Sequence, residues 1–239
     1  MTHPRKPALK SSKRSEKDAK VAQTQEAASR AARRQRRRDR SREEILDAAR
    51  RILLKDGIAG TTLAAVAKEV GMSKAALYYY YPSKDAMFFE LVFGVLEKHA
   101  KRVHDAVEKE TSGGTALRTI IRESVKNFAS HLADFQLAYL QGQLAAKGEV
   151  HFNAQQFARI RPLNDLWLAG AAKYLSDERR KRPGRARVEP RLMAFLAYVA
   201  AIGLLTMKGM VESVNDPLIY SDDQLVEGFA RIFEAAAAP

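Results

Sequence analysis

Apolar residues recur at intervals of three and four along most of the chain after residue 41, which is the spacing of one buried helix face. Glycine, proline and polar clusters interrupt this pattern at residues 111–114, 147–153, 176–190 and 215–223. No run of alternating apolar and polar residues predicts a strand. We therefore expect an all-α protein whose helices are separated at these breaks.

The first helix is predicted over residues 42–56, with apolar positions 45, 49, 52 and 53 on one face. Ser41 and Glu44 have the spacing of a capping box, which predicts the start of the helix. Gly57 suits the left-handed backbone with which many helices end.

Two very short helices follow, joined by the turn VGMS. Thr62 is a good N-cap for the first and Ser73 for the second, which ends near Tyr80 because residue 81 precedes a proline. Ser83 then caps a fourth helix. This succession predicts a helix-turn-helix at about residues 62–81, although a purely structural three-helix domain has the same periodicity.

Four consecutive tyrosines, Tyr78–Tyr81, close the second short helix. Successive residues point about 100° apart, so with Leu77 as the buried anchor the last two flank the core and the first two point outward beside Ala75. Small alanines allow close approach to a DNA major groove, and tyrosine hydroxyls donate to phosphates. The alternative is that the outer tyrosines pack against the fourth helix or a second subunit, and Tyr80 fits either the core or a phosphate.

Positive charge is concentrated at the N-terminus. The 239 residues carry a net charge of +13, of which residues 1–40 contribute +10, from 14 lysines and arginines against four acidic residues. We expect this arm to be mostly disordered without a polyanion, because it lacks the apolar residues of a core. A solubilising tail is the alternative, but the Arg33–Arg40 cluster directly precedes the predicted helix-turn-helix domain, which favours an arm that adds phosphate contacts.

The segment REEILDAARRILLKDGIAGTTLAAVAKEVGMSKAALYYYYPSKDAMF, residues 42–88, resembles the DNA-binding domain of the TetR/AcrR family of bacterial transcriptional regulators. The resemblance rests on EEILDAA, Gly57, the paired threonines, VAKEVGMSKAALYY and PSKDAMF. Ala75 stands where the family usually has glycine or a similar small residue, and Tyr80–Tyr81 replace the common His–Phe. The resemblance implies a helix-turn-helix DNA-binding domain over residues 41–100.

Residues and resemblance together predict a double-stranded DNA operator as partner, read by the helix at 73–80. The candidate DNA contacts are Arg40, Arg42, Thr61, Thr62, Ser73, Lys74, Ala75, Ala76, Tyr78, Tyr79, Tyr80 and Lys84.

Beyond residue 100 the resemblance is architectural, and it implies a helical domain over 101–239 that binds an effector and dimerises through its last two helices. The apolar window Leu192–Leu205 is shorter than the roughly 18 residues read as membrane-spanning, so we expect a core or interface helix and no membrane partner. Ordinary packing within one chain explains the same pattern. The candidate dimer contacts are Leu192, Phe195, Leu196, Val199, Ile202, Gly203, Leu225, Phe229, Ile232 and Phe233.

A small-molecule pocket in this domain is expected to be mostly apolar with a few polar groups. The candidate ligand contacts are His131, Tyr139, Gln143, Arg159 and Trp167. The five histidines lack metal-ligand spacing and the chain has no cysteine, so no metal is predicted. No nucleophile elbow or phosphate-loop glycine pattern occurs, so neither an enzyme nor a cofactor is predicted.

These observations predict a sequence-specific transcriptional regulator, a homodimeric repressor that a small hydrophobic ligand releases from its operator. A dimer is expected because one short helix reads too few base pairs for useful specificity. The lack of cysteine and of a signal peptide indicates the cytoplasm. Two alternatives remain: a sequence-tolerant nucleic-acid-binding protein driven by the basic arm, and a small-molecule-binding or interaction protein whose DNA-binding half is vestigial.

Overall fold

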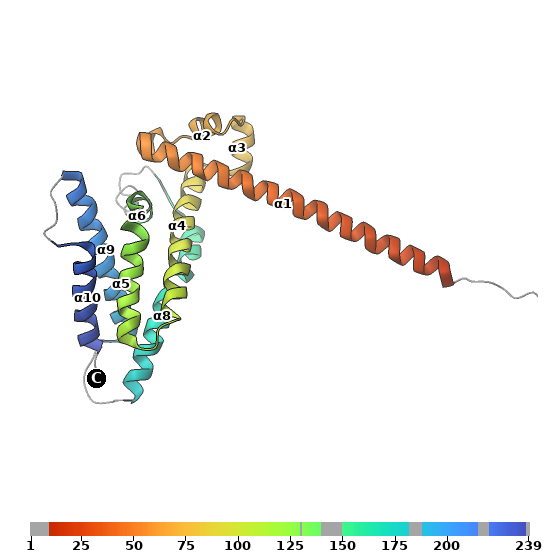
Figure 1. Cartoon of the computed structure of the whole chain (residues 1–239). Helices are drawn as coiled ribbons and strands as arrows, with labels where there is room; N and C mark the ends of the chain where they lie inside the picture. The colour runs from red at the N-terminus through yellow and green to blue at the C-terminus, as the bar shows by residue number, and fades with distance from the viewer. Residues whose placement is uncertain (1–9, 130, 140–149, 182–187, 215–219, 238–239) are drawn as a thin grey trace, which may run out of the picture.

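The computed structural model describes residues 10–129, 131–139, 150–181, 188–214 and 220–237. Within these residues every regular element is a helix, which confirms the all-α class (Figure 1). The C-terminal part of α1 (Lys10–Gly60) lies with α2 (Leu63–Glu69) and α3 (Lys74–Tyr80) at one end of the molecule. The remaining helices form a bundle below them: α4 (Lys84–Val107), α5 (Gly113–Ala129), α6 (Leu132–Tyr139), α8 (Ala154–Lys181), α9 (Pro190–Val214) and α10 (Asp222–Ala237).

The basic arm differs from the expectation of disorder. Residues 10–40 are helical and continuous with the predicted first helix, so α1 projects far beyond the bundle (Figure 1). This segment contains no glycine or proline and is rich in alanine, lysine, arginine and glutamine, which are strong helix formers. Pairs four residues apart, such as Glu26 with Arg30 at 2.7 Å, add support.

The predicted capping box is wrong for the same reason. Ser41 lies inside α1 rather than at its start, because nothing in the preceding residues ends the helix. Glu44 instead accepts a hydrogen bond from Arg40 at 3.1 Å. The predicted end of the helix is confirmed, since Gly57 has a φ of 70° inside the kink that closes α1.

The helix-turn-helix forms at the predicted residues. Thr62 caps α2 and Ser73 caps α3, each accepting a backbone N–H three residues on at 3.1 Å. Gly71 turns the chain between them with a φ of 68°, a backbone that favours glycine. Leu77 is the fully buried anchor of α3 and packs in a core with Ile45 of α1.

One helix, α4, belongs to both halves of the molecule. Its first turns place Met87 and Val92 in the core of the helix-turn-helix domain. Its last turns place Val103 and Val107 in a second core with α5, α8 and α9. The predicted domain boundary near residue 100 therefore falls within a continuous helix, so a tilt of α4 moves the helix-turn-helix end.

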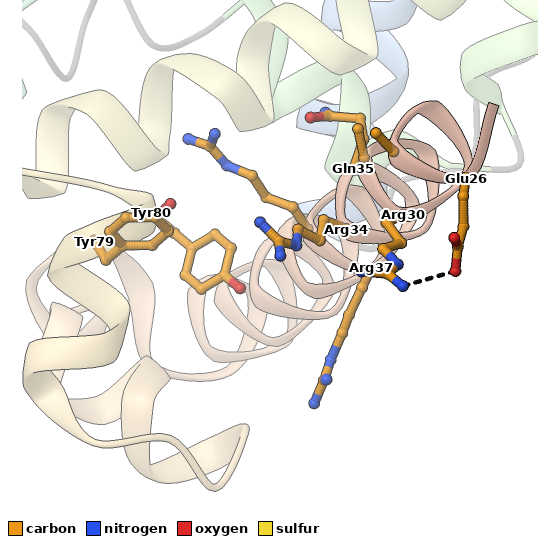
Figure 2. A pocket seen from close by; sticks show the side chains of 10 residues that line it. Glu26, Arg30, Arg34, Gln35, Arg37, Tyr79 and Tyr80 are labelled. Carbon is orange, nitrogen blue, oxygen red and sulfur yellow. Dashed lines mark hydrogen bonds and ion pairs between the residues drawn. The ribbon is translucent and has the colours of Figure 1, made fainter. Parts of the chain in front are cut away.

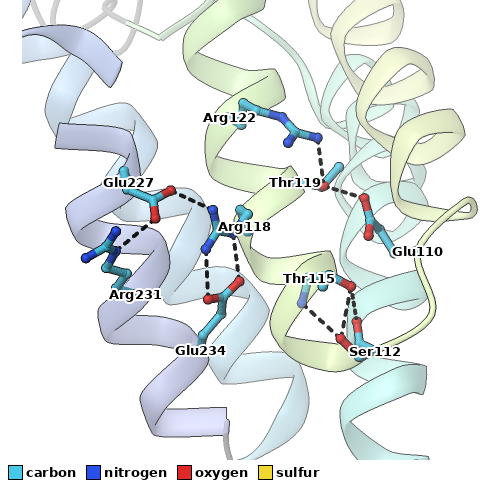
Figure 3. A network of polar contacts seen from close by, with 9 residues as sticks. All are labelled: Glu110, Ser112, Thr115, Arg118, Thr119, Arg122, Glu227, Arg231 and Glu234. Atoms are coloured by element: carbon cyan, nitrogen blue, oxygen red, sulfur yellow. Dashed lines mark hydrogen bonds and ion pairs between the residues drawn. The ribbon is translucent and has the colours of Figure 1, made fainter. Parts of the chain in front are cut away.

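Helix α5 runs through the middle of the bundle, and α10 packs along it. Arg118 of α5 donates to both carboxylate oxygens of Glu234 at 2.7 and 2.9 Å and to Glu227 at 2.5 Å (Figure 3). Both glutamates belong to α10, and Arg231 also donates to Glu227 at 2.9 Å. This network fixes α10 on α5 with a planar bidentate arginine contact.

Candidate nucleic-acid interface and effector region

The outer face of α3 consists of small and aromatic side chains. Lys74, Ala75 and Ala76 are exposed at its start. Tyr78 and Tyr79 follow with 43% and 68% of their surface exposed. A helix that presents alanines and tyrosines to solvent instead of charges has the shape and chemistry for close approach to a base-pair edge or a phosphate.

The four tyrosines divide as their helical angles predict. Tyr81 is buried, with 1% of its surface exposed, and this burial raises the pKa of its phenol to about 12. Tyr80 is half-buried and packs against the same core, while its ring lies edge-on to Tyr79 with centroids 5.4 Å apart. Tyr78 lies beside Lys74, whose Nζ is 5.8 Å from the ring centroid.

Two of the predicted phosphate ligands also hold the domain together. The hydroxyls of Thr62 and Ser73 accept from backbone N–H groups, yet both residues are exposed and their hydroxyl protons remain available to an acceptor. The Nζ of Lys84 donates to the carbonyl of Ile58 at 2.6 Å, so it ties the start of α4 to the end of α1. Its ammonium has further donors for a phosphate.

The structure contradicts Thr61 as a predicted DNA contact, and it shows that Arg42, although a third of its side chain is exposed, also has partners within the chain. Thr61 is fully buried, and its hydroxyl donates to the carbonyl of Gly57 at 2.7 Å, which stabilises the turn into α2 and removes the side chain from solvent. The guanidinium of Arg42 lies 5.0 Å from the ring centroid of buried Tyr81 and 4.0 Å from Glu90. Arg42 therefore joins α1 to α4, whereas Arg40 stays exposed.

The structure also forms a groove that sequence reasoning missed. It lies between the arm portion of α1 and the end of α3, and its volume is about 760 Å³ (Figure 2). Arg34 points toward Tyr79 and Tyr80 across it, whereas Arg30 points toward Glu26 and Arg37 points away from the tyrosines. The recurrence of these arginines at helical spacing was readable, but the expectation of disorder gave no reason to place them on one face.

An aromatic cluster occupies the core of the bundle. Tyr139 and Trp167, both predicted ligand contacts, lie against Tyr198 of α9, with ring centroids 6.1 and 3.8 Å from it. The Tyr198 hydroxyl donates to that of Tyr139, and burial raises the pKa of both phenols. His99 of α4 adjoins the same cluster, with its ring centroid 6.2 Å from that of Tyr198.

His99 is a buried polar group with one satisfied nitrogen. Asn127 accepts from Arg102 through its oxygen, so its amide nitrogen donates to Nδ1 of His99 at 3.0 Å. The proton of the neutral imidazole is then on Nε2, which is buried without a hydrogen-bond partner. Burial, and secondarily Arg102, lowers the pKa of His99 to about 4.

A cavity of about 280 Å³ lies where the helix-turn-helix domain meets the bundle. Its apolar lining includes Leu91, Val95, Phe128 and Leu137. Its polar lining combines three cations with three acids and two neutral side chains: Arg50, Lys98, Arg102, Asp47, Glu90, Asp134, Asn127 and His131. Phe128 and Asn127 are shared between this cavity and the surroundings of His99.

The predicted ligand contacts lie in different parts of the structure. His131 lines the junction cavity, and Tyr139 and Trp167 lie in the aromatic cluster. Arg159 is exposed and forms a two-pronged ion pair with Glu90, stacked over Phe93, so it joins α8 to α4 on the surface. Gln143 lies outside the described residues.

One side of α9 is apolar and exposed. Leu192, Phe195, Leu196 and Val199 keep between 40% and 47% of their surface accessible, and Met207 and Met210 continue the stripe. The opposite side packs in the core through small residues such as Ala194, Ala197 and Ala201. The stretch Pro190–Val211 is long and apolar enough to cross a membrane by length and composition.

The other predicted dimer contacts differ in how much of their surface is exposed. Ile232 of α10 is 64% exposed, and Gly203 of α9 is exposed with open space around it. Ile202, Phe229 and Phe233 are half-buried and pack against the core of their own chain, because α10 lies along α5. Leu225 is half-buried at the start of α10.

Residues 45–91 match the model of the family described as bacterial regulatory proteins, tetR family. The chain is 27% identical over 191 residues to the uncharacterized HTH-type transcriptional regulator YuxN of Bacillus subtilis, an alignment that covers 73% of this chain and 66% of the relative. It is 29% identical over 146 residues to the nucleoid occlusion factor SlmA of Mannheimia succiniciproducens, covering 58% of this chain and 67% of the relative. The chain therefore spans about two thirds of the length of these relatives.

Solved structures share the fold at low identity. A regulator of the TetR/AcrR family from Thermobifida fusca superposes with a TM-score of 0.61 at 20% identity, over 81% of this chain and 96% of that one. FadR of Bacillus subtilis in complex with stearoyl-CoA superposes with a TM-score of 0.59 at 15% identity, over 82% of this chain and 97% of that one. AibR in complex with isovaleryl coenzyme A and operator DNA superposes with a TM-score of 0.59 at 16% identity, over 80% of this chain and 96% of that one.

Proposed function

From the premise that the chain belongs to the TetR/AcrR family of transcriptional regulators, we propose that it is a cytoplasmic homodimeric repressor, released from its operator by a small apolar ligand with an anionic end. The observation that carries the DNA-binding part is the outer face of α3, where two alanines and two tyrosines are exposed beside a single lysine. A charged, solvated face would be the normal outcome for a helix with no partner.

On DNA, Lys74, Ala75 and Ala76 enter the major groove, and Tyr78 donates its hydroxyl to a phosphate. Tyr79 lies toward the backbone at the edge of the same surface. The alanines permit close approach and meet thymine methyl groups. Thr62, Ser73 and Lys84 add contacts to phosphates from the flanks.

The dimer forms through the exposed stripe of α9. A contiguous apolar surface of this kind is unusual on a monomeric soluble protein and marks an interaction site. Its small central residue, Gly203, permits the close approach of a second helix. Two copies of α3 then read two half-sites of one operator.

The ligand binds at the junction cavity. Two of the acids in its lining, Asp134 and Glu90, are paired with Arg50 and Arg159. Lys98 and Arg102 then outnumber the remaining acid, Asp47, and together with the apolar wall they suit a molecule with an apolar part and an anionic end. FadR and AibR, which share the fold, were crystallised with coenzyme A thioesters, so acyl-CoA compounds are the first ligands to test. Residues of α1, α4, α5 and α6 all line the cavity, so a ligand there shifts the helix-turn-helix domain relative to the bundle.

The experiment is a fluorescence-anisotropy titration of DNA from the region upstream of the gene, against a scrambled duplex of equal length. Operator binding should be at least 10³-fold tighter than scrambled binding at physiological salt, and one acyl-CoA of a chain-length series should weaken it. Equal affinity for both duplexes would contradict the repressor. If an acyl-CoA binds but leaves operator affinity unchanged, the release mechanism is wrong.

A further inference from the structure

The arm of α1 carries a row of arginines on the side that faces α3. Arg30, Arg34, Arg37 and Arg38 line the groove between arm and recognition helix, and Tyr79 and Tyr80 form its opposite wall. Ala27 and Ala31 lie between the arginines and leave the groove open. Figure 2 shows Arg34 directed toward the two tyrosines across the groove.

The groove is strongly cationic. Its one acidic lining residue, Glu26, pairs with Arg30 at 2.7 Å at the far end. Within the described part of the chain, no carboxylate pairs with Arg34, Arg37 or Arg38. The guanidinium of Arg38 lies 5.4 Å from the ring centroid of Tyr79, so an aromatic face holds one of the cations in place.

The arm has no structural role that explains this arrangement. The side chains from Gln25 to Arg40 are exposed on all faces of the helix, so they bury no core. A helix without packing is only marginally stable in water. Arg34 and Arg38, whose guanidinium groups pair with no carboxylate and lie toward the exposed Tyr79, therefore point to a polyanionic occupant.

We propose that this groove holds the sugar–phosphate backbone of DNA next to the site read by α3, so that the arm lengthens the footprint by sequence-independent phosphate contacts. The inference rests on the proposed DNA-binding function, because Tyr79 belongs both to the groove and to the outer face of α3. Guanidinium groups bind phosphate oxygens in a planar, two-pronged way. The row from Arg30 to Arg38 spans about 12 Å of helix, over which one DNA strand presents about three to four phosphates.

The test compares two double variants with the same loss of charge. R34Q/R38Q removes cations from the groove, whereas R33Q/R36Q removes cations from positions of the same helix outside it. Each is titrated with operator DNA carrying ten flanking base pairs on both sides, over a series of KCl concentrations. Circular dichroism of each variant checks that helix content is retained.

Because the proposed dimer has two arms, R34Q/R38Q removes four phosphate contacts, each of which contributes about 0.9 to the slope of log K against log salt. The slope should therefore fall by about 3.6, and binding should weaken roughly 900-fold at 0.15 M salt. R33Q/R36Q should lose less than half as much. R34K/R38K should keep the slope, because the charge remains. On operator DNA trimmed of its flanks, R34Q/R38Q and the unaltered chain should bind alike.

Equal losses of affinity in the two glutamine variants would contradict the proposal that the groove binds DNA, because they would show a general effect of charge. An R34Q/R38Q variant that binds like the unaltered chain would contradict the proposal too, as would a loss of affinity that persists on trimmed DNA. A failure of the proposed function is distinguishable from a failure of the groove proposal, because a different comparison tests each. If the unaltered chain does not distinguish operator from scrambled DNA, the slope difference between the two variants is still measurable on the scrambled duplex.

Discussion

Arg50 of α1 forms an ion pair with Asp134 of α6, and this contact joins the helix-turn-helix domain directly to the bundle. Both side chains line the junction cavity, so the pair lies at the place where a ligand and the DNA-binding end meet. About a third of Arg50 and less of Asp134 is exposed. Few other polar contacts described here cross from α1 to the bundle, which makes the pair a suitable point to measure coupling.

Arg50→Met and Asp134→Asn should each lower the free energy of unfolding by about 1 kcal/mol, and the double variant should be no less stable than the worse single variant. Urea unfolding of the four proteins gives the coupling energy. Arg51→Met is the matched control, because Arg51 pairs with Glu69 within the helix-turn-helix domain at 3.3 Å with both side chains more exposed. Additive losses at Arg50 and Asp134 would show that the pair does not couple the domains.

Tyr78→Phe removes one hydroxyl from the outer face of α3. If that hydroxyl donates to a phosphate, each protomer of the proposed dimer loses one hydrogen bond of about 1 kcal/mol, so operator and scrambled DNA should both bind about 30-fold more weakly. Anisotropy titrations measure both affinities. Tyr220→Phe, at an exposed tyrosine before α10, should change neither. A loss confined to the operator would instead assign Tyr78 to base reading.

Ala75→Trp places a large side chain at the point where α3 is proposed to lie closest to the base pairs. The variant should lose the preference for operator over scrambled DNA by at least 100-fold, because a large side chain at this position keeps the helix out of the groove. Competition binding with both duplexes measures the ratio. Ala169→Trp, at an exposed alanine of α8, is the control for a bulky side chain on the surface. An intact preference in Ala75→Trp would remove α3 from the major groove.

Phe195→Glu places a charge in the exposed stripe of α9. The protein should then elute and scatter light as a monomer, and operator affinity should fall at least 100-fold because two half-sites are no longer read together. Phe157→Glu is matched, since this α8 phenylalanine is 56% exposed against 47% for Phe195. A Phe195→Glu protein that remains dimeric would move the interface to another surface.

The depressed pKa of His99 predicts an acid-sensitive fold. Burial lowers it from 6.5 to about 4, so between these values the unfolded chain binds a proton that the folded chain does not. The free energy of unfolding should therefore fall as the pH drops through this window, and His99 should account for about 2 kcal/mol between pH 7 and pH 5.

Urea unfolding at the two pH values measures the effect in the unaltered chain and in His99→Gln. The variant should lose this part of the pH dependence, whereas His151→Gln, at an exposed histidine, should retain it. The same dependence in His99→Gln as in the unaltered chain would assign the acid sensitivity to other groups.

Local signals in the sequence predicted the DNA-binding end well. Thr62 and Ser73 cap the two short helices, Gly57 and Gly71 adopt left-handed backbone, and the tyrosines divide into buried and exposed pairs. Each of these features depends on residues within one or two helical turns, where side-chain direction follows from the 3.6-residue period. The fold class and the resemblance to the TetR/AcrR family depend on the same short-range information.

The structure of the arm, residues 10–40, differs from what its sequence predicts. Low hydrophobicity predicts disorder in the arm, and Ser41 predicts the start of a helix. Helix propensity and pairs such as Glu26–Arg30, however, stabilise a helix over the same residues without a core. Once the arm is helical, its arginines acquire a common face toward Tyr79.

By itself the sequence determined the helices of the DNA-binding end, their caps and the outward face of α3, because neighbouring residues fix these. Only the tertiary structure decided that Thr61 faces inward, that Phe229 and Phe233 pack on α5, and that Arg159 closes an ion pair with Glu90. It also brought Arg50 to Asp134 across more than 80 residues of chain. Such contacts depend on how helices pack, and helical periodicity specifies a buried side without specifying its partner.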